Sequence, residues 1–478
     1  PTAVGMRSQT LVAVAVGGAL AIGTVRFLAR RASPCLDLRI RLLDTWAGCC
    51  LGRLAAVTTA PFRPHFPVAP FAGDRSLSAA WLTRVLRSSG MIGPEVGVSS
   101  ARLETWTGEA FGGGHGTACR VVIDYVGINA AAGGAKAPPS LVMKTSPGNL
   151  RRLVGMMAGG QNREVFFHRR FGAELRAILG DVLHGTSDPS GFVLLSEEVK
   201  GTPLHRYLGA QLEFFGLEAP PEAREVQQTK RGPVDALKEA FSAAAVLHAS
   251  HWNDSTLKEI PWLKGAAWYR GGDRASWEQG MALTQRQWRK VKQLHSEEVL
   301  GFELSAKLSR IIDASFARST WEAFQATISD PSQPFALIHG DFHAQNMLWR
   351  AQTGDSHGTV CMFDWSEVGP GGPLTELGQM MISDVHPEVW REHDAKLVRC
   401  YWEQLVERGV DRAEFPFEAC WSLYETEGVQ KWIWLFPIMF MFAPASMMVY
   451  FQNQLEAFIV DHGDYDSYEI HSSMLLLM

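Results

Sequence analysis

The sequence has almost no excess of charge of either sign, and its cysteines lack the spacing of metal or disulfide frameworks. Its 478 residues carry 45 Lys and Arg against 50 Asp and Glu, a net charge of −5, which argues against a nucleic-acid-binding protein. The seven cysteines form no C-x-x-C pair, so we expect reduced thiols. With 46% hydrophobic residues, the chain is neither disordered nor collagen-like, and its charge content excludes a multi-span transporter. A large globular protein of about three domains, or one two-lobed enzyme with extensions, remains.

Acidic residues are absent from the first 36 positions, which carry arginines instead. Residues 11–25 are apolar and small, and with their flanks they approach the ~20 residues that cross a bilayer. Three interpretations compete for 1–36: a membrane anchor over 8–28 that leaves the rest facing the cytoplasm, an organelle-targeting peptide, and an ordinary helix. Residues 37–76 then predict an amphipathic stretch and a Pro-rich linker.

In the rest of the chain, strand-like runs come before helical ones. Apolar, β-branched runs at 119–126, 140–144 and 191–195 lie ahead of mainly helical sequence. This order predicts an α+β protein of two lobes, with a small β-rich N-lobe at 77–200 that binds nucleotide and a large, mainly helical C-lobe at 201–478.

One apolar, aromatic run at 432–451 is long enough to span a membrane. Pro437 and Pro444 interrupt it, so core helices are the favoured interpretation. If one face of this run lined a binding pocket, its Met and Trp side chains would suit a lipophilic alcohol.

The strongest functional signal is the segment Leu-Ile-His-Gly-Asp-Phe-His-Ala-Gln-Asn-Met-Leu at 337–348, followed by an apolar run that ends on Asp364. Phosphoryl transfer needs one Asp to orient the attacking hydroxyl, and an Asn and a second Asp to ligate Mg²⁺. Asp341, Asn346 and Asp364 supply these groups, and the spacing lets one loop present the first two. The competing interpretation is a loop of turn-forming residues that caps a hairpin.

The residues at 339–346 resemble the H-G-D-x-H-x-x-N loop of the aminoglycoside phosphotransferase/choline kinase-like superfamily, and Phe-Asp-Trp at 363–365 resembles its metal-binding motif. Trp-Leu-Thr-Arg-Val-Leu-Arg at 81–87 and Leu-His-Ala at 247–249 are similar to the ecdysteroid-kinase-like (CHK) branch. The resemblance covers about 77–460. It implies a bilobal protein-kinase-like fold, ATP and Mg²⁺ as cofactors, and a small-molecule hydroxyl as acceptor.

The resemblance also implies a lysine on the phosphates and a carboxylate that holds it. Lys144 closes a short strand-like run, and Glu164 lies early in the helix predicted at 162–179. Taken alone, Lys144 is a solvated charge at a strand end, and Glu164 is a favourable acid in a first helical turn. Their order along the chain favours the phosphate-binding interpretation.

A glycine-rich turn precedes this strand and is a candidate for cradling phosphates through backbone N–H groups. A plain glycine hairpin is the alternative. The turn enters a strand rather than a helix, and no G-K-[ST] occurs, so dinucleotide-binding and P-loop motifs are excluded. The candidate residues are Gly112, Gly113, Gly114 and Gly116.

Two departures from the superfamily pattern stand out. Glu376 occupies the place of an Asp that braces the catalytic loop, and a polar insert at 350–358 predicts a surface hairpin. His339 is expected to support the loop by hydrogen bonds, whereas no role for His343 follows from the sequence.

The sequence thus predicts an enzyme that moves the γ-phosphoryl group of ATP to a hydroxyl of a small molecule, with a lipophilic alcohol as one candidate acceptor. Its rival is a membrane-tethered, catalytically inactive kinase-like protein that binds nucleotide or acts as a scaffold. Protein kinase activity is disfavoured by His343, by Asp-Trp in place of D-F-G, and by the absence of an A-P-E motif.

Overall fold

The computed structural model describes residues 77–105, 117–127, 137–145, 163–188, 191–210, 232–350, 359–441, 443–463 and Tyr468. The predicted anchor or targeting segment, the linker, the candidate phosphate-binding glycines and most of the polar insert lie outside these residues. Their interpretation therefore stays a prediction.

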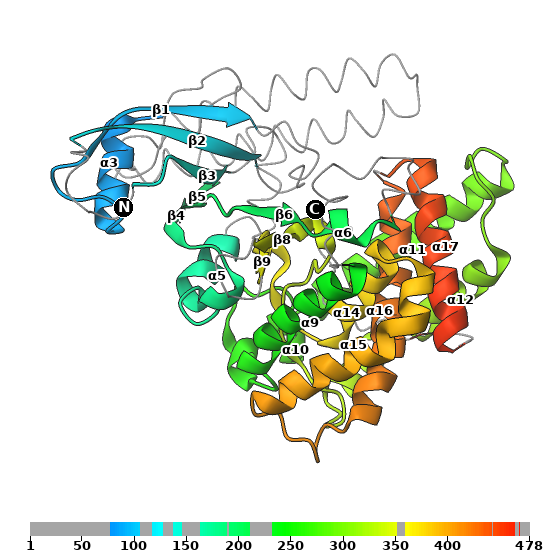
Figure 1. Cartoon of the computed structure of the whole chain (residues 1–478). Coiled ribbons are helices and arrows are strands. Elements are labelled where there is room, and N and C mark those ends of the chain that lie inside the picture. Colours follow the sequence, from blue (N-terminus) through cyan, green and yellow to red (C-terminus); the bar gives the residue numbers. More distant parts are fainter. Residues whose placement is uncertain are drawn as a thin grey trace, which may run out of the picture. The chain divides into compact units, whose positions relative to one another are not determined.

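The described residues form two compact units (Figure 1). The small unit contains the described residues up to Val165 together with Val182–Glu197, and the large unit contains Phe166–Asp181 and the described residues from Glu198 onward. The small unit is built on an antiparallel sheet and the large one mainly on helices. The α+β prediction, with strands first and helices later, is confirmed.

The small unit is a five-stranded antiparallel sheet in the order β1-β2-β3-β5-β4. Helix α3 begins at the Ser78 cap, whose hydroxyl accepts the Trp81 N–H, and buries Trp81, Leu82 and Leu86 against one face of the sheet. Strand β4 was not predicted, because its Val-Leu-His-Gly-Thr-Ser-Asp sequence lacks the apolar alternation of a strand. The elements are α3 (Ala79–Ser88), β1 (Gly97–Thr105), β2 (Thr117–Val126), β3 (Ser140–Thr145), β4 (Val182–Asp188) and β5 (Gly191–Glu197).

Helix α5 (Arg163–Phe171) is shorter than the predicted helix at 162–179, because the chain turns at Gly172 before a 3₁₀ segment, η3 (Arg176–Ile178). Its first turn belongs to the small unit and the remainder to the large one.

The large unit has one hydrophobic core, which runs through its long helices. Helix α9 shows why these segments are helical: Pro233 opens it, and apolar residues recur at helical spacing along the buried face. The helices are α6 (His205–Leu208), α9 (Pro233–Ser250), α10 (Ala266–Tyr269), α11 (Arg274–Ser296), α12 (Ala306–Arg318), α13 (Trp321–Ile328), α14 (Leu374–Asp384), α15 (Pro387–Glu407), α16 (Phe417–Met439) and α17 (Ala445–His462), with a 3₁₀ segment η4 (Ser255–Glu259).

Short strands of the large unit carry the loop singled out by the sequence. Strand β7 pairs with β10, and β8 lies between β6 and β9 in a three-stranded sheet. The elements are β6 (Gly201–Pro203), β7 (Ala336–Ile338), η5 (Ala344–Asn346), β8 (Met347–Arg350), β9 (Val360–Met362), η6 (Trp365–Glu367) and β10 (Gly369–Gly371).

The apolar run at 432–451 forms the end of α16 and the start of α17, and most of its described side chains are buried in the core of the large unit. Pro437 lies inside α16, and Pro444 caps α17. Across the described ranges, no helix combines the length and apolar character that crossing a membrane requires. The prediction of core helices is confirmed.

Candidate active site

In the small unit, Lys144 and Glu164 form an ion pair, with Nζ 2.7 Å from Oε2. Alternation along β3 turns Leu141 and Met143 into the core under α3, which leaves Lys144 on the opposite face. On that face Val165 packs against Leu194, the cross-strand neighbour of Lys144. The helix thereby carries Glu164 to the lysine, and the structure brings these two predicted residues together.

In the large unit, the chain turns sharply at Gly340, directly after β7. Gly340 has φ +83°, and a Cβ at this position would lie 2.2 Å from the Glu367 carbonyl oxygen. Only glycine fits such a left-handed, crowded position without strain. Asp341 follows this turn at the start of the loop.

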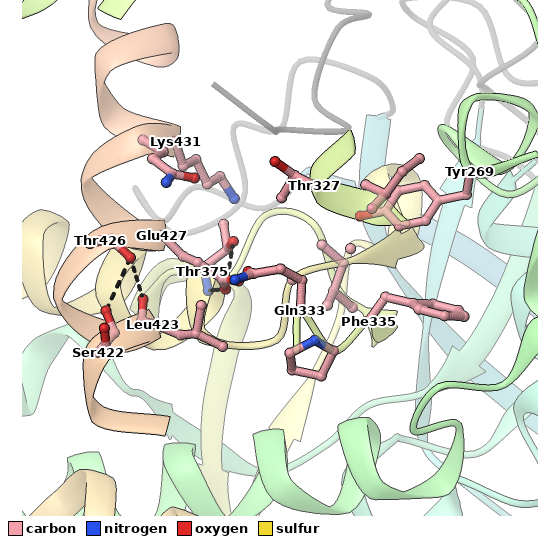
Figure 2. A pocket seen from close by; sticks show the side chains of 16 residues that line it. Tyr269, Thr327, Gln333, Phe335, Thr375, Ser422, Leu423, Thr426, Glu427 and Lys431 are labelled. Atoms are coloured by element: carbon pink, nitrogen blue, oxygen red, sulfur yellow. Dashed lines mark hydrogen bonds between the residues drawn. The ribbon is translucent and has the colours of Figure 1, made fainter. Parts of the chain in front are cut away.

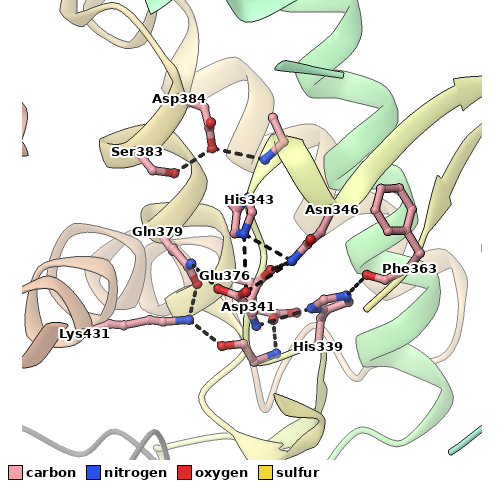
Figure 3. A network of polar contacts seen from close by, with 12 residues as sticks. His339, Asp341, His343, Asn346, Phe363, Glu376, Gln379, Ser383, Asp384 and Lys431 are labelled. Carbon is pink, nitrogen blue, oxygen red and sulfur yellow. Dashed lines mark hydrogen bonds and ion pairs between the residues drawn. The ribbon is translucent and has the colours of Figure 1, made fainter. Parts of the chain in front are cut away.

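Asp341, His343 and Asn346 contact one another within this loop (Figure 3). Oδ2 of Asp341 is 3.3 Å from Nε2 of His343 and 3.2 Å from Nδ2 of Asn346, and that amide also donates to the Asp341 carbonyl at 3.0 Å. The Asn346 amide nitrogen is thus used inside the loop, and the amide oxygen is the atom that Asn346 can offer to a cation. No role for His343 follows from the sequence, whereas in the structure its imidazole contacts the Asp341 carboxylate directly.

The β8–β9 hairpin brings Asp364 to the same loop. Met347 pairs with Met362, and the Phe363 N–H donates to the Asn346 carbonyl at 3.1 Å, so Asp364 follows one residue beyond Asn346 in this register. Asp364 adopts φ 64° and ψ 62°, a left-handed conformation that costs a non-glycine residue free energy. Such outliers are concentrated at functional sites.

His339 joins the two segments from within the core, where its side chain is fully buried. The Asp341 N–H donates to Nδ1 at 3.3 Å, so the proton lies on Nε2, which donates to the Phe363 carbonyl at 2.9 Å. The Trp365 ring lies against the imidazole, and Phe167 stacks on Trp365 with a centroid distance of 4.0 Å. The expected role of His339 as a support for the loop matches these contacts.

The carboxylate of Asp341 is held in its charged form. Burial alone would raise its pKa, but His343, Lys431 and His339 outweigh that effect and lower it well below the ordinary range. Burial likewise opposes a charged His343, yet the neighbouring carboxylates, Asp341 first and then Asp384 and Asp364, raise its pKa. The Asp341 carboxylate and the His343 imidazole thus favour each other's charged forms, against the effect of burial.

Glu376 braces this loop despite its extra methylene. Its Oε1 accepts the Gly340 N–H at 2.8 Å, and its Oε2 lies 2.9 Å from Nε2 of His248, whose Nδ1 is 2.8 Å from the Tyr401 hydroxyl. Burial opposes ionisation, but His248 overcomes it and the pKa of Glu376 is lowered. The departure from the superfamily pattern therefore leaves the brace intact.

The donors at the loop fit Mg²⁺ that arrives with nucleotide phosphates. Over the parts of the chain that the structure describes, no group of three or more His, Cys, Asp or Glu side chains is arranged to hold a metal by itself. Mg²⁺ commonly takes one or two carboxylates and fills its remaining positions with phosphate oxygens and water. Asp364 and the amide oxygen of Asn346 are suited to that partial set.

A cavity of about 270 Å³ lies in the large unit, where it is lined by the end of β7 and by Lys431, which contacts the loop at Gly340 (Figure 2). Tyr269 and Phe335 contribute rings, Leu423 an aliphatic wall, and Glu427 and Lys431 charged groups. Its α16 lining lies at 422–431, ahead of the Met- and Trp-rich run, so that run does not line this cavity.

The sequence missed Lys431 and Gln379, which contact the loop from α16 and α14. Lys431 stands directly before Trp-Ile-Trp in an apolar helix. A lysine in an apolar helix is rarely buried without a partner. Its position in such a helix is therefore the feature of the sequence that could indicate a buried polar contact.

Comparison with known protein families gives a match over part of the chain. Residues 270–412 match the ecdysteroid kinase-like family. The resemblance to this branch is thus confirmed over a segment that includes Asp341, Asn346 and Asp364. No curated protein matches the sequence.

Among solved structures, the chain is similar to the ethanolamine kinase of Plasmodium vivax, at 9% identity over 80% of this chain and 87% of that one, with a TM-score of 0.38. A type VIII aminoglycoside-3'-phosphotransferase shares 18% identity over 70% and 96% of the two chains, with a TM-score of 0.30. An amicoumacin kinase in complex with AMP-PNP, Ca²⁺ and Ami shares 9% identity over 78% and 92%, with a TM-score of 0.36. Similarities this low carry no argument about individual residues, whose roles depend on the contacts described above.

Proposed function

We propose that this chain is a phosphotransferase that moves the γ-phosphoryl group of ATP to a hydroxyl of a small molecule. The observation that supports it is the geometry of one loop and its adjoining hairpin. Asp341 presents a charged carboxylate, and Asp364 directly follows Phe363, whose N–H donates to the Asn346 carbonyl. A hydroxyl-orienting carboxylate beside an Asp and an Asn with oxygen ligands is the set that phosphoryl transfer requires.

In this proposal Asp341 orients the acceptor hydroxyl. As the bond between the hydroxyl oxygen and the γ-phosphorus forms, the bond from that phosphorus to the ADP oxygen breaks, and the hydroxyl proton passes to Asp341. A carboxylate with a depressed pKa is a weak base, so its main contribution is to position the hydroxyl, and it takes the proton late.

The remaining groups handle the phosphates. Asn346 and Asp364 would hold Mg²⁺, which neutralises phosphate charge when bound. Lys144, fixed by Glu164, would contact the α- and β-phosphates.

The cavity in the large unit is our candidate for the acceptor site. Aromatic walls from Tyr269 and Phe335 favour an apolar ring, whereas Glu427 and the hydroxyls of Thr327 and Thr426 offer partners to a few polar groups. With Lys431 beside the single carboxylate of Glu427, this lining disfavours a polycationic sugar, and a lipophilic alcohol with a few further polar groups is our candidate acceptor.

The central test is ADP release that depends on both Mg²⁺ and an acceptor, measured over a library of alcohols and amino sugars. We expect Asp341→Asn to lower kcat on the order of 10³-fold. Asp411→Asn, which changes an exposed carboxylate beyond the end of α15, should leave kcat unchanged. An Asp341→Asn variant with unchanged turnover would remove Asp341 from the mechanism.

The acceptor site has its own test. Thr426→Phe should fill the cavity and raise KM for the acceptor about tenfold while KM for ATP stays constant. Ala395→Phe adds the same ring at an exposed position on α15 and serves as the control. Equal acceptor KM values for the two variants would place the acceptor elsewhere.

A further inference from the structure

Helices α14 and α16 approach each other backbone to backbone. A Cβ on Gly378 would lie 2.6 Å from the Gly428 Cα, and one on Gly428 would lie 2.5 Å from the Gly378 Cα. Only a glycine at both positions permits this crossing. The side chains that follow on each helix, Gln379 and Lys431, are therefore brought together.

Lys431 reaches from this crossing to the catalytic loop (Figure 3). Its Nζ donates to the Gly340 carbonyl at 2.8 Å and to Oε1 of Gln379, and its side chain is almost fully buried. Nε2 of Gln379 lies 3.5 Å from Oδ1 of Asp341. Lys431 thus contacts the residue before Asp341 directly and the Asp341 carboxylate through one amide.

The charges around Lys431 favour its cationic form near Asp341. Asp341 faces it from the loop, Glu376 from α14 and Glu367 from η6. Lys264, the other nearby cation, is paired with Glu367. Glu427 lies one turn away on α16 itself, and its carboxylate accepts hydrogen bonds from Thr375.

We propose that Lys431, acting through Gln379 and the Gly340 carbonyl, is a positioning residue that sets the orientation of Asp341 for phosphoryl transfer. The proposal rests on the phosphotransferase function above. Because Lys431 also lines the cavity, the same side chain borders the acceptor and the group that orients its hydroxyl.

The first experiment compares Lys431→Met, Lys431→Arg and Gln379→Leu in steady-state assays of Mg²⁺- and acceptor-dependent ADP release. Displacement of a catalytic group commonly lowers the reaction rate about 10²-fold. We therefore expect Lys431→Met to lower kcat by about that factor and to change KM for ATP by less than about threefold. Lys431→Arg should recover most of this loss, because it keeps the charge and can reach the same oxygens. Gln379→Leu should lower kcat by about tenfold, since it removes the bridge but leaves the Gly340 contact.

The control is Gln452→Leu. Gln452 is a similarly buried glutamine on α17, where it bonds to the backbone at Ser305 and Glu303. Its loss should change thermal stability as much as the Gln379 substitution does, yet leave kcat within about twofold.

The second readout is the pH profile of kcat. Burial lowers the pKa of Lys431 to about 8, so the wild type should lose activity as the pH rises through that value. Lys431→Arg stays charged and should keep its activity to higher pH. If Lys431 were purely structural, the wild type and Lys431→Arg would lose kcat at the same pH.

The outcomes separate the two proposals. Absence of phosphoryl transfer by the wild type to any acceptor would overturn the proposed function and this inference with it. Transfer by the wild type, together with an unimpaired Lys431→Met or with identical pH limbs for wild type and Lys431→Arg, would overturn the role of Lys431 alone. If Lys431→Met does not fold, the kcat difference between Gln379→Leu and Gln452→Leu decides: equal values would overturn the proposal.

Discussion

Two contacts of similar length, each between a basic side chain and a carboxylate, differ in their surroundings, one in each unit. Lys144 and Glu164 are 2.7 Å apart in the small unit, with side chains 15% and 5% exposed. His248 and Glu376 are 2.9 Å apart in the large unit, and both side chains are fully buried. The first pair leaves its cation accessible to a ligand, whereas the second is sealed inside the core.

This difference separates a pair whose cation can bind a ligand from a pair that holds part of the protein in place. A buried pair loses much of its Coulombic gain to desolvation, so it persists where its geometry holds something else in place. Glu376 holds the Gly340 N–H, and through it the loop that carries Asp341. We therefore expect substitutions in the sealed pair to affect folding first, and substitutions in the accessible pair to affect activity first.

The largest expected effect comes from Glu376. Glu376→Leu leaves His248 and the Gly340 N–H buried without their acceptor, and should lower the free energy of unfolding by about 3–5 kcal/mol, as measured by urea denaturation. Glu376→Asp is the more specific test, because its shorter side chain cannot reach both the Gly340 N–H and His248. We expect it to lower the free energy of unfolding by about 1–2 kcal/mol. An Asp variant as stable as the wild type would show that the two-sided contact is not needed.

Next comes Lys144. Lys144→Met should lower kcat/KM for ATP by about 10²–10³-fold, since it removes a charged donor aimed at phosphate, while the melting temperature changes little. Lys292→Met, which removes an exposed lysine paired with Asp313 on α12, should leave both quantities unchanged. If Lys144→Met lowered the melting temperature strongly as well as the activity, the distinction between the two pairs would fail.

Glu427 offers a third buried carboxyl, one whose hydrogen bonds come from the uncharged Thr375. Burial raises its pKa from 4.5 to about 7, so the folded state keeps a proton that the unfolded state releases between those values. The wild type should therefore lose stability as the pH rises from 4.5 to 7, and Glu427→Gln should not share this loss. The difference in unfolding free energy between variant and wild type should grow by up to about 3 kcal/mol over this range. A difference that stays constant from pH 4.5 to 8 would contradict the raised pKa.

The smallest effect is expected at Glu164. Glu164→Gln keeps a hydrogen-bonding side chain beside Lys144 but removes its charge, so kcat/KM for ATP should fall about tenfold, less than in Lys144→Met. Combining the two substitutions should cost no more than Lys144→Met alone, because Glu164 acts through the lysine. A fully additive double variant would indicate an independent role for Glu164.

Much of the site could be predicted because its parts are close in sequence or joined by short elements. Asp341 and Asn346 belong to one loop, and a hairpin brings Asp364 beside them. The Lys144–Glu164 pair was implied by the resemblance to the superfamily, supported by the order of one strand and the next helix. Strand β4 was missed because its polar sequence becomes a strand only by pairing with β5.

The sequence by itself determined the chemistry of the loop, since local spacing and turn-forming residues fix which side chains one loop can present. Only the tertiary structure decided what holds that loop. Glu376 meets His248 across 128 positions of the chain, and Lys431 meets Gln379 across 52. These contacts depend on how helices cross, here at Gly378 and Gly428, and no periodicity in a single sequence specifies which two helices approach that closely.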